Sequence, residues 1–276
     1  MNVRRYGLTL VALIGISVFS GLLVAQDDVH TVVFDNLSFS FPASLATGLQ
    51  IETKEANPLL QPDEQFWVAT YPEHIRFSFM NYLDGNRFRL PLLQDAYPDT
   101  AQIFVYTTES LREFGYEFLE QHTALDTLLR ARLDLSAYVG ATVRLPEVRL
   151  PFLPWVNSHQ VLRSHPQHIE LDGGGSGVRY LTYYSQEAGH LTDQQLFYTF
   201  QGLLAEDAVY VSAVFPVKSA VLPEEVDTSG LDWNEFAAHY NAYLTETFAQ
   251  IDSLPDEAFN PGLNTLDQLV ASISME

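Results

Sequence analysis

The chain has 276 residues, of which 47% are hydrophobic and 13% aromatic, and it contains no cysteine. This composition excludes an intrinsically disordered chain, and the lack of cysteine excludes thiol catalysis, cysteine-ligated zinc and a thioether-linked lipid anchor. With 35 acidic and 14 basic residues the net charge is −21, which disfavours nucleic acid and anionic lipid surfaces as partners.

The first 25 residues have the pattern of a secretory signal. Arg4 and Arg5 precede an apolar run from Leu8 to Val24, and Ala25 stands just before a polar stretch. A basic start, a short apolar core and a small final residue predict export with cleavage after Ala25. The alternative is an uncleaved anchor, because the run approaches the length of a spanning helix. We expect an extracytoplasmic protein that is secreted, periplasmic or on the cell surface, and that contacts a membrane only through a retained N-terminal helix.

The processed chain, residues 26–276, is expected to form one α+β domain. Removal of Arg4 and Arg5 leaves 12 basic residues against 35 acidic ones, a net charge of −23. Like molecules of this charge repel one another, and we therefore expect a monomer. No internal repeat or charged linker divides the chain into two units.

Four stretches of alternating or apolar residues predict strands in the first half of the chain: 31–34, 37–41, 74–82 and 102–106. Asp35 and Asn36 predict a tight turn between the first two strands. Residues 43–62 are mixed in character and predict no element.

The clearest helix is expected over residues 109–134, where apolar residues recur at helical spacing. Thr107 or Thr108 can cap its N-terminus, because a threonine hydroxyl accepts a hydrogen bond from the first free amides. The proline-rich residues 140–165 predict a long surface loop that carries apolar groups. Loops of this length are often functional, although they also cover sheet edges.

The second half of the chain predicts an antiparallel meander of four strands: 168–171, 178–186, 196–203 and 209–217. Asp232 and Glu235 resemble a capping box that begins a helix, which Pro255 ends. A short amphipathic helix is expected around residues 266–273. Because both faces of the strands carry apolar groups, we expect helices to cover both faces of the sheet.

This order of elements resembles a known family. The strands Val178–Tyr183, Leu196–Phe200 and Val209–Ala213, with a helix ending at Phe248–Ile251 and an opening strand Leu37–Pro42, are similar to the PsbP-type α/β/α sandwich. That family includes extrinsic photosystem proteins and many exported bacterial proteins. The resemblance implies an antiparallel sheet flanked by helices and a binding or scaffolding role without catalysis, and it carries over no ligand residue.

The strongest polar group of the sequence is a candidate metal site formed by His165, His168, Glu170 and Asp172, with His159 nearby. The last three of the four alternate along an expected strand, so their side chains share a face. Histidine and carboxylate ligands suit zinc or another transition metal. The spacing matches no established motif, and the alternative is a polar strand face beside a flexible loop.

Other candidate motifs are weaker. Residues 173–177 are glycine-rich, but no Lys-Ser or Lys-Thr follows and the next element is an expected strand, so a flexible hairpin tip is favoured over a phosphate loop. Ser158 and Ser164 stand beside histidines, yet no Gly-x-Ser-x-Gly elbow is present. Residues 84–86 and 95–99 are too sparse in ligands for a calcium loop. Aromatic residues of the meander either line a groove or form the core: Tyr180, Tyr183, Tyr184, Phe197, Tyr198, Phe200 and Tyr210.

Two function hypotheses follow from these observations. The first is an extracytoplasmic binding or accessory domain that acts on a protein or small-molecule ligand without catalysis and without a cofactor. The second is a secreted hydrolase, metal-assisted through the histidines and carboxylates of residues 159–172.

Overall fold

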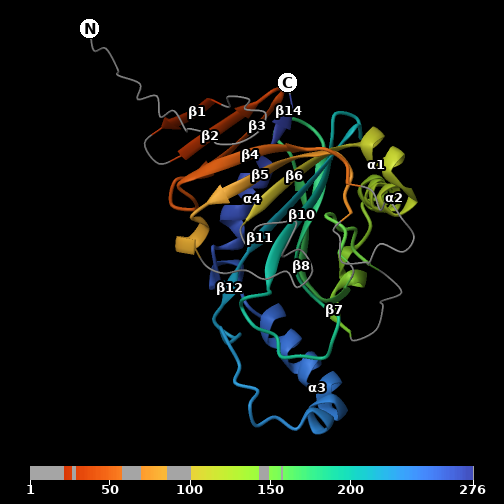
Figure 1. Cartoon of the computed structure of the whole chain (residues 1–276), viewed down its shortest axis with the longest axis vertical. Coiled ribbons are helices and arrows are strands. Elements are labelled where there is room, and N and C mark those ends of the chain that lie inside the picture. Colours follow the sequence, from red (N-terminus) through yellow and green to blue (C-terminus); the bar gives the residue numbers. More distant parts are fainter. Residues whose placement is uncertain are drawn as a thin grey trace.

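A computed structural model describes residues 22–26, 29–57, 70–85, 101–142, 149–156 and 158–275. Its described part is a mixed α+β structure with four α-helices and a large antiparallel sheet of eight strands, accompanied by two smaller sheets (Figure 1). The predicted α+β class is confirmed.

The large sheet has the strand order β4-β5-β6-β11-β10-β9-β8-β7. Its strands are β4 (Gly48–Lys54), β5 (His74–Met80), β6 (Gln102–Thr107), β7 (Gly140–Ala141), β8 (His159–Glu170), β9 (Ser176–Ser185), β10 (Phe197–Leu204) and β11 (Val209–Pro216). The predicted meander is confirmed, because β8, β9, β10 and β11 are consecutive antiparallel neighbours. Strand β4 lies in the stretch for which the sequence predicts no element.

A second sheet has the order β1-β2-β3-β14, with β1 (Leu22–Gln26), β2 (Val29–Phe34), β3 (Leu37–Pro42) and β14 (Ser274–Met275). The predicted hairpin and its turn at Asp35 are confirmed, and Asp35 has a φ of 52°. Strand β1 contains the last four residues of the expected signal, whereas residues 1–21 lie outside the described part. Within the described residues, we find no helix with the length and apolar character needed to span a membrane.

The predicted helix over 109–134 is two helices in the structure, α1 (Thr108–Phe114) and α2 (Tyr116–Ala131). Gly115 separates them with an extended backbone, and its amide still donates to the carbonyl of Leu111. The periodic spacing of apolar residues continues through the break, which is why the sequence predicts one helix. The predicted cap is confirmed, since the hydroxyl of Thr107 accepts a hydrogen bond from the amide of Ser110.

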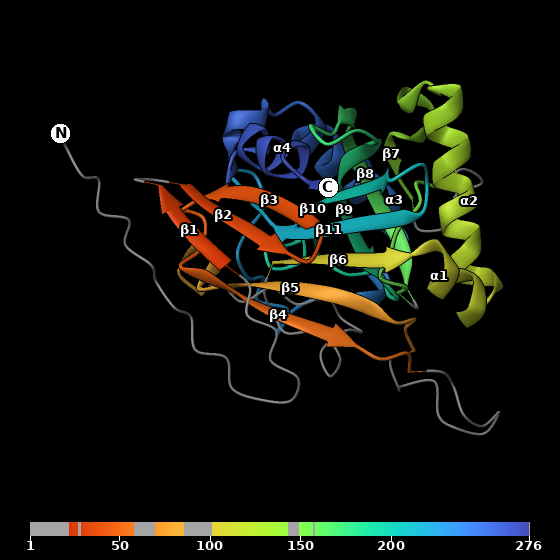
Figure 2. The ribbon, with the colours of Figure 1, turned by 90° about the horizontal axis from the view of Figure 1, so that it is seen from above.

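Two more helices follow the meander, α3 (Trp233–Asp252) and α4 (Leu263–Ala271), and β12 (Lys218–Ser219) pairs with β13 (Phe259–Asn260). The predicted capping residue of α3 is confirmed: the carboxylate of Asp232 accepts from the amides of Asn234 and Glu235. Figures 1 and 2 show α1 and α2 on one side of the large sheet and α4 on the other.

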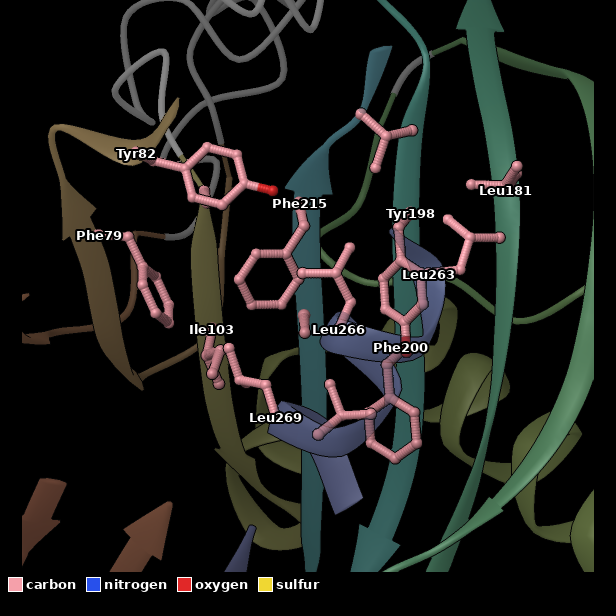
Figure 3. Packing of buried hydrophobic residues seen from close by; sticks show 14 of the residues in the cluster. Phe79, Tyr82, Ile103, Leu181, Tyr198, Phe200, Phe215, Leu263, Leu266 and Leu269 are labelled. Atoms are coloured by element: carbon pink, nitrogen blue, oxygen red, sulfur yellow. The ribbon is translucent and has the colours of Figure 1, made fainter. Parts of the chain in front are cut away.

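The core has one large cluster on one side of the sheet and two smaller clusters, both with residues of α2, on the other. The large cluster joins the sheet to buried residues of β2, β3, α3 and α4, and Figure 3 shows Leu263, Leu266 and Leu269 of α4 directed at aromatic side chains of the sheet. One of the smaller clusters joins Phe104 and Tyr210 of the sheet to Leu111 of α1 and Leu125 of α2. Burial of this much aromatic surface stabilises the fold without disulfides.

The expected long surface loop over 140–165 is partly wrong. Strand β8 already begins at His159, and the 149–156 segment lies against the sheet with Leu150, Phe152 and Leu153 buried. Trp155 is exposed at 37%. The prolines of this segment prevent regular structure, but its apolar side chains pack into the core.

The glycine-rich turn between β8 and β9 is shaped by close packing. Gly175 has a φ of +98°, and a Cβ there would lie 2.2 Å from the carbonyl oxygen of Leu203. A Cβ on Gly177 would lie 2.4 Å from the ring of Phe200, which also covers Gly202. These glycines allow neighbouring strands and an aromatic ring to approach the backbone.

Candidate functional site

The four predicted metal-site residues lie on different sides of β8. The ring of His165 packs 5.2 Å from that of Phe259, beside the end of α3, and its Nε2 lies 2.8 Å from the carbonyl oxygen of Leu254. Nε2 of His168 lies 3.2 Å from the carbonyl oxygen of Leu133, which directly follows α2.

The two predicted carboxylates are also apart from each other. Glu170 pairs with Arg132 at 2.5 Å, on the side where His168 lies. Asp172 lies in the turn after β8, where its amide donates to the carbonyl of Ala271 at the end of α4. A bulge in β8 at His165, which has a φ of 52°, shifts the alternation of side chains. Throughout the described part of the chain, no three His, Asp or Glu side chains are grouped so as to hold a metal ion.

The structure brings one serine, one histidine and one aspartate together. The hydroxyl of Ser164 lies 2.6 Å from Nδ1 of His165 and donates to the carboxylate of Asp252 at 2.7 Å. The single hydroxyl proton of Ser164 is donated to Asp252 and not to His165, so the ring is not placed to take that proton as it would in a catalytic triad. Ser164 is also fully buried, so this group fastens the end of α3 to the bulge of β8.

A buried arginine next to this group has a structural role as well. Arg179 of β9 is 3% exposed and pairs with Asp256 at 2.7 Å and with Asp267 at 3.4 Å. Burial raises the pKa of Asp267, while Arg179 and the hydroxyl of Tyr198 act in the opposite direction. These pairs tie β9 and β10 to α4 and to the segment before it.

A cavity of about 80 Å³ lies on the other side of the sheet. It is lined by Gln121 of α2, residues of the 149–156 segment, Ser158, Gln160 of β8 and Tyr184 of β9: the segment contributes Arg149, Leu150, Phe152, Trp155 and Val156. A volume of this size holds roughly half a dozen water molecules at about 10–15 Å³ each. We take this cavity as the candidate functional site.

The wall formed by the 149–156 segment is held by hydrogen bonds to its backbone. The hydroxyl of Tyr180 donates to the carbonyl of Pro151 at 2.8 Å, and the amide of Phe152 donates to Gln121 at 3.1 Å. The side chain of Gln201 accepts from the amide of Leu153 at 3.0 Å and donates to its carbonyl at 3.2 Å. Three elements, β9, α2 and β10, therefore fix three successive residues, and the wall is pre-organised.

Two side chains that line the cavity carry buried polar atoms without a hydrogen-bond partner in the described structure. They are the hydroxyl oxygen of Ser158 and Oε1 of Gln160. The amide nitrogen of Gln160 donates to the hydroxyl of Tyr184 at 3.0 Å and contacts that of Tyr180 at 3.4 Å. Because buried polar groups in proteins are nearly always paired, such atoms beside a cavity indicate a place for a polar ligand or water.

Arg149 is the one charged side chain among the described residues that line the cavity. Burial raises the pKa of Tyr184, so its hydroxyl remains neutral, while the charges of Arg163 and Arg149 act in the opposite direction. Arg163 is 6% exposed and donates to the carbonyls of Tyr138 and Gln160, and burial lowers its pKa. Neither arginine forms an ion pair in the described part of the chain.

Sequence reasoning missed most of these residues. Gln121 falls within an expected helix, and Arg149 and Gln160 fall within an expected loop. Of the seven aromatic residues that the sequence singles out in the meander, only Tyr184 lines the cavity, and all seven are buried in the core. One feature of the sequence does indicate this region, because the polar Gln201 interrupts the apolar strand β10. In the structure its side chain accepts a hydrogen bond from the amide of Leu153 in the wall of the cavity.

No protein-family model matches this chain, and no curated protein matches it.

Proposed function

We propose that this protein is an exported, extracytoplasmic accessory domain that binds a small polar molecule in the cavity beside the 149–156 segment and does not change it chemically. The observation that carries the proposal is the combination of a pre-organised wall with unpartnered polar atoms of Ser158 and Gln160. A pre-organised site binds a ligand at low cost in conformational entropy.

The proposed lack of catalysis has support in the chemistry of the lining. Apart from Arg149, the lining consists of apolar, aromatic, amide and hydroxyl side chains, without histidine or carboxylate among the described residues. General acid–base catalysis uses groups that gain or lose a proton near neutral pH, and this lining offers none.

We further propose the α/β/α sandwich of the PsbP type as the architecture. Support comes from the core, since α1 and α2 contribute to the two smaller clusters and α3 and α4 to the large one. Export is proposed from residues 1–25, and N-terminal sequencing of the exported protein is expected to begin at Gln26. A mature chain that begins at Met1 would contradict cleavage.

The binding proposal is tested with ¹⁵N-labelled protein and three four-carbon probes: butyrate, butyramide and 1-butanol. The indole N–H of Trp155, assigned by its loss in Trp155→Phe, reports from the rim of the cavity. We expect at least one probe to shift this signal with saturation while that of Trp233 stays in place, and butyramide to be recovered intact.

A variant that fills the cavity serves as control. Ser158→Leu replaces an unpartnered hydroxyl by a larger apolar side chain, and it is expected to abolish the shift at Trp155 while the protein stays folded. If no probe moves the Trp155 signal in the wild type, or if Trp155 and Trp233 move together without saturation, the binding proposal is wrong.

A further inference from the structure

We infer that the molecule bound beside the 149–156 segment is a small organic anion, a short-chain carboxylate, whose charge is met by Arg149. This inference deepens the proposed function and rests on it.

The distribution of charge is the first support. The chain carries 35 acidic residues, yet the cavity is lined by one arginine and by no carboxylate of the described residues. The described part contains seven arginines, and Arg76, Arg130, Arg132 and Arg179 all form ion pairs with acidic residues. Arg149 is exposed, lines the cavity and pairs with no acidic residue of the described part, so its guanidinium is available there to an anion from solution.

Arg163 is an independent second support. It is almost fully buried, it donates to two carbonyl oxygens, at 2.7 Å to Tyr138 and at 3.1 Å to Gln160, and no described carboxylate pairs with it. A buried charge without a counter-ion is costly, and an anion bound nearby lowers that cost. Its charge reaches Tyr184 in the lining, as the direction of its effect on the pKa of that hydroxyl indicates.

The neutral polar side chains of the lining all carry a hydrogen-bond donor. The hydroxyl of Ser158 has no partner among described residues. If the amide of Gln160 turns by 180°, Tyr184 donates to its oxygen and its NH₂ group takes the unpartnered position. Such a turn exchanges two atoms of nearly equal size, and the hydrogen-bond partners decide between the two orientations. An anion therefore finds donors from Arg149, Ser158 and Gln160.

Size and the apolar wall indicate the class of anion. About 80 Å³ accommodates only a small molecule, of roughly half a dozen water-sized groups, and Leu150, Phe152 and Val156 add apolar surface to the lining. An inorganic anion leaves this surface in contact with water, whereas the alkyl chain of a short carboxylic acid covers it.

The test is a titration of the full chain with butyrate, butyramide and sulfate, followed at the indole N–H of Trp155 and by calorimetry. We expect butyrate to bind roughly tenfold more tightly than the neutral isostere or sulfate, since charge-assisted bonds to arginine are about twice as strong as neutral ones. Arg149→Gln is expected to weaken butyrate binding by about tenfold and to leave butyramide unchanged. Arg112→Gln removes the same charge from an arginine of α1 that pairs with no described acidic residue, and it is the matched control.

The outcomes separate this inference from the proposed function. Equal binding of butyrate and butyramide overturns the anion and leaves a binding cavity, while sulfate binding as tightly as butyrate overturns the carboxylate. Equal losses in Arg149→Gln and Arg112→Gln show attraction by overall charge and overturn the role of Arg149. If none of the probes binds to the folded protein, the inference and the proposed function both fail.

Discussion

Two serines with buried hydroxyl oxygens, one on β8 and one just before it, differ in what those hydroxyl groups contact. Ser164 is bonded to both His165 and Asp252, whereas the hydroxyl of Ser158 has no partner in the described structure. Removing a bonded hydroxyl leaves its partners unpaired and costs about 1–3 kcal/mol, but removing an unpartnered one leaves no such deficit. The same substitution therefore has different consequences at the two positions.

We expect Ser164→Ala to lower the free energy of unfolding by about 1–3 kcal/mol and Ser158→Ala to change it by less than about 0.5 kcal/mol. Urea denaturation of both variants measures the difference. Ser158→Ala is also expected to weaken the binding of butyrate. A large loss of stability in Ser158→Ala would mean that its hydroxyl has a structural partner.

The buried side chain of His74 makes the stability of the folded protein depend on pH. Burial lowers its pKa from 6.5 to about 4, aided by the charges of Arg76 and Lys54, and the ring lies 2.8 Å from the carbonyl oxygen of Pro72. Between these pKa values the unfolded chain binds more protons than the folded protein, so stability rises with pH. The contribution of neutral His74 to the stability of the folded protein is complete above about pH 6.5 and is lost as the pH falls towards 4.

The free energy of unfolding of the wild type is therefore expected to fall by roughly 3 kcal/mol more than that of His74→Phe between pH 7 and pH 4, at about 1.4 kcal/mol per pKa unit. Urea denaturation measures the free energy of unfolding of both proteins at several pH values. Because both contain the same carboxylates, the difference between the two proteins at each pH excludes the contribution of the carboxylates. Parallel pH profiles for the two proteins would show that His74 is not buried in its neutral form.

At the scale of the element, β8 determines which side chains meet. Its bulge places His165 towards α3 and α4, while His168 and Glu170 face the end of α2. The strand thus separates His165 from His168 and Glu170, which the sequence predicts to form one site. The second residue of the neighbouring strand β9 is Gly177, whose missing side chain makes room for Phe200 of β10.

The separation across β8 predicts that one equivalent of zinc leaves the melting temperature unchanged and is removed by dialysis. A ligand that binds only the folded state raises the melting temperature, so thermal unfolding with and without zinc is a sensitive test. Stoichiometric zinc that is lost in the double variant His165→Ala, His168→Ala would instead establish the metal site that the sequence predicts.

Packing over Gly177 predicts that Gly177→Ala lowers the free energy of unfolding by about 1–3 kcal/mol, because the added methyl group overlaps the ring of Phe200. Gly189→Ala is the matched control, since a Cβ there meets nothing within 4 Å. Thermal or urea unfolding compares the two. Equal effects of both substitutions would show that Phe200 moves aside at little cost.

At the scale of the whole molecule, the sequence predicts elements better than it predicts the site. Alternation and turn residues locate the meander, and Thr107 and Asp232 begin helices as expected, because these signals are local. The break at Gly115 and the strand β4 carry no such signal. The cavity unites Gln121, five residues of the 149–156 segment, Ser158, Gln160 and Tyr184, and only packing across the sheet brings them together.

The most direct test of the binding cavity is a crystal structure of the full chain grown with butyrate. We predict a carboxylate within hydrogen-bond distance of the guanidinium of Arg149 and of the hydroxyl of Ser158, with the alkyl chain against Phe152 and Val156. A cavity that is closed by its own side chains, or that holds only ordered water at saturating butyrate, would contradict the account.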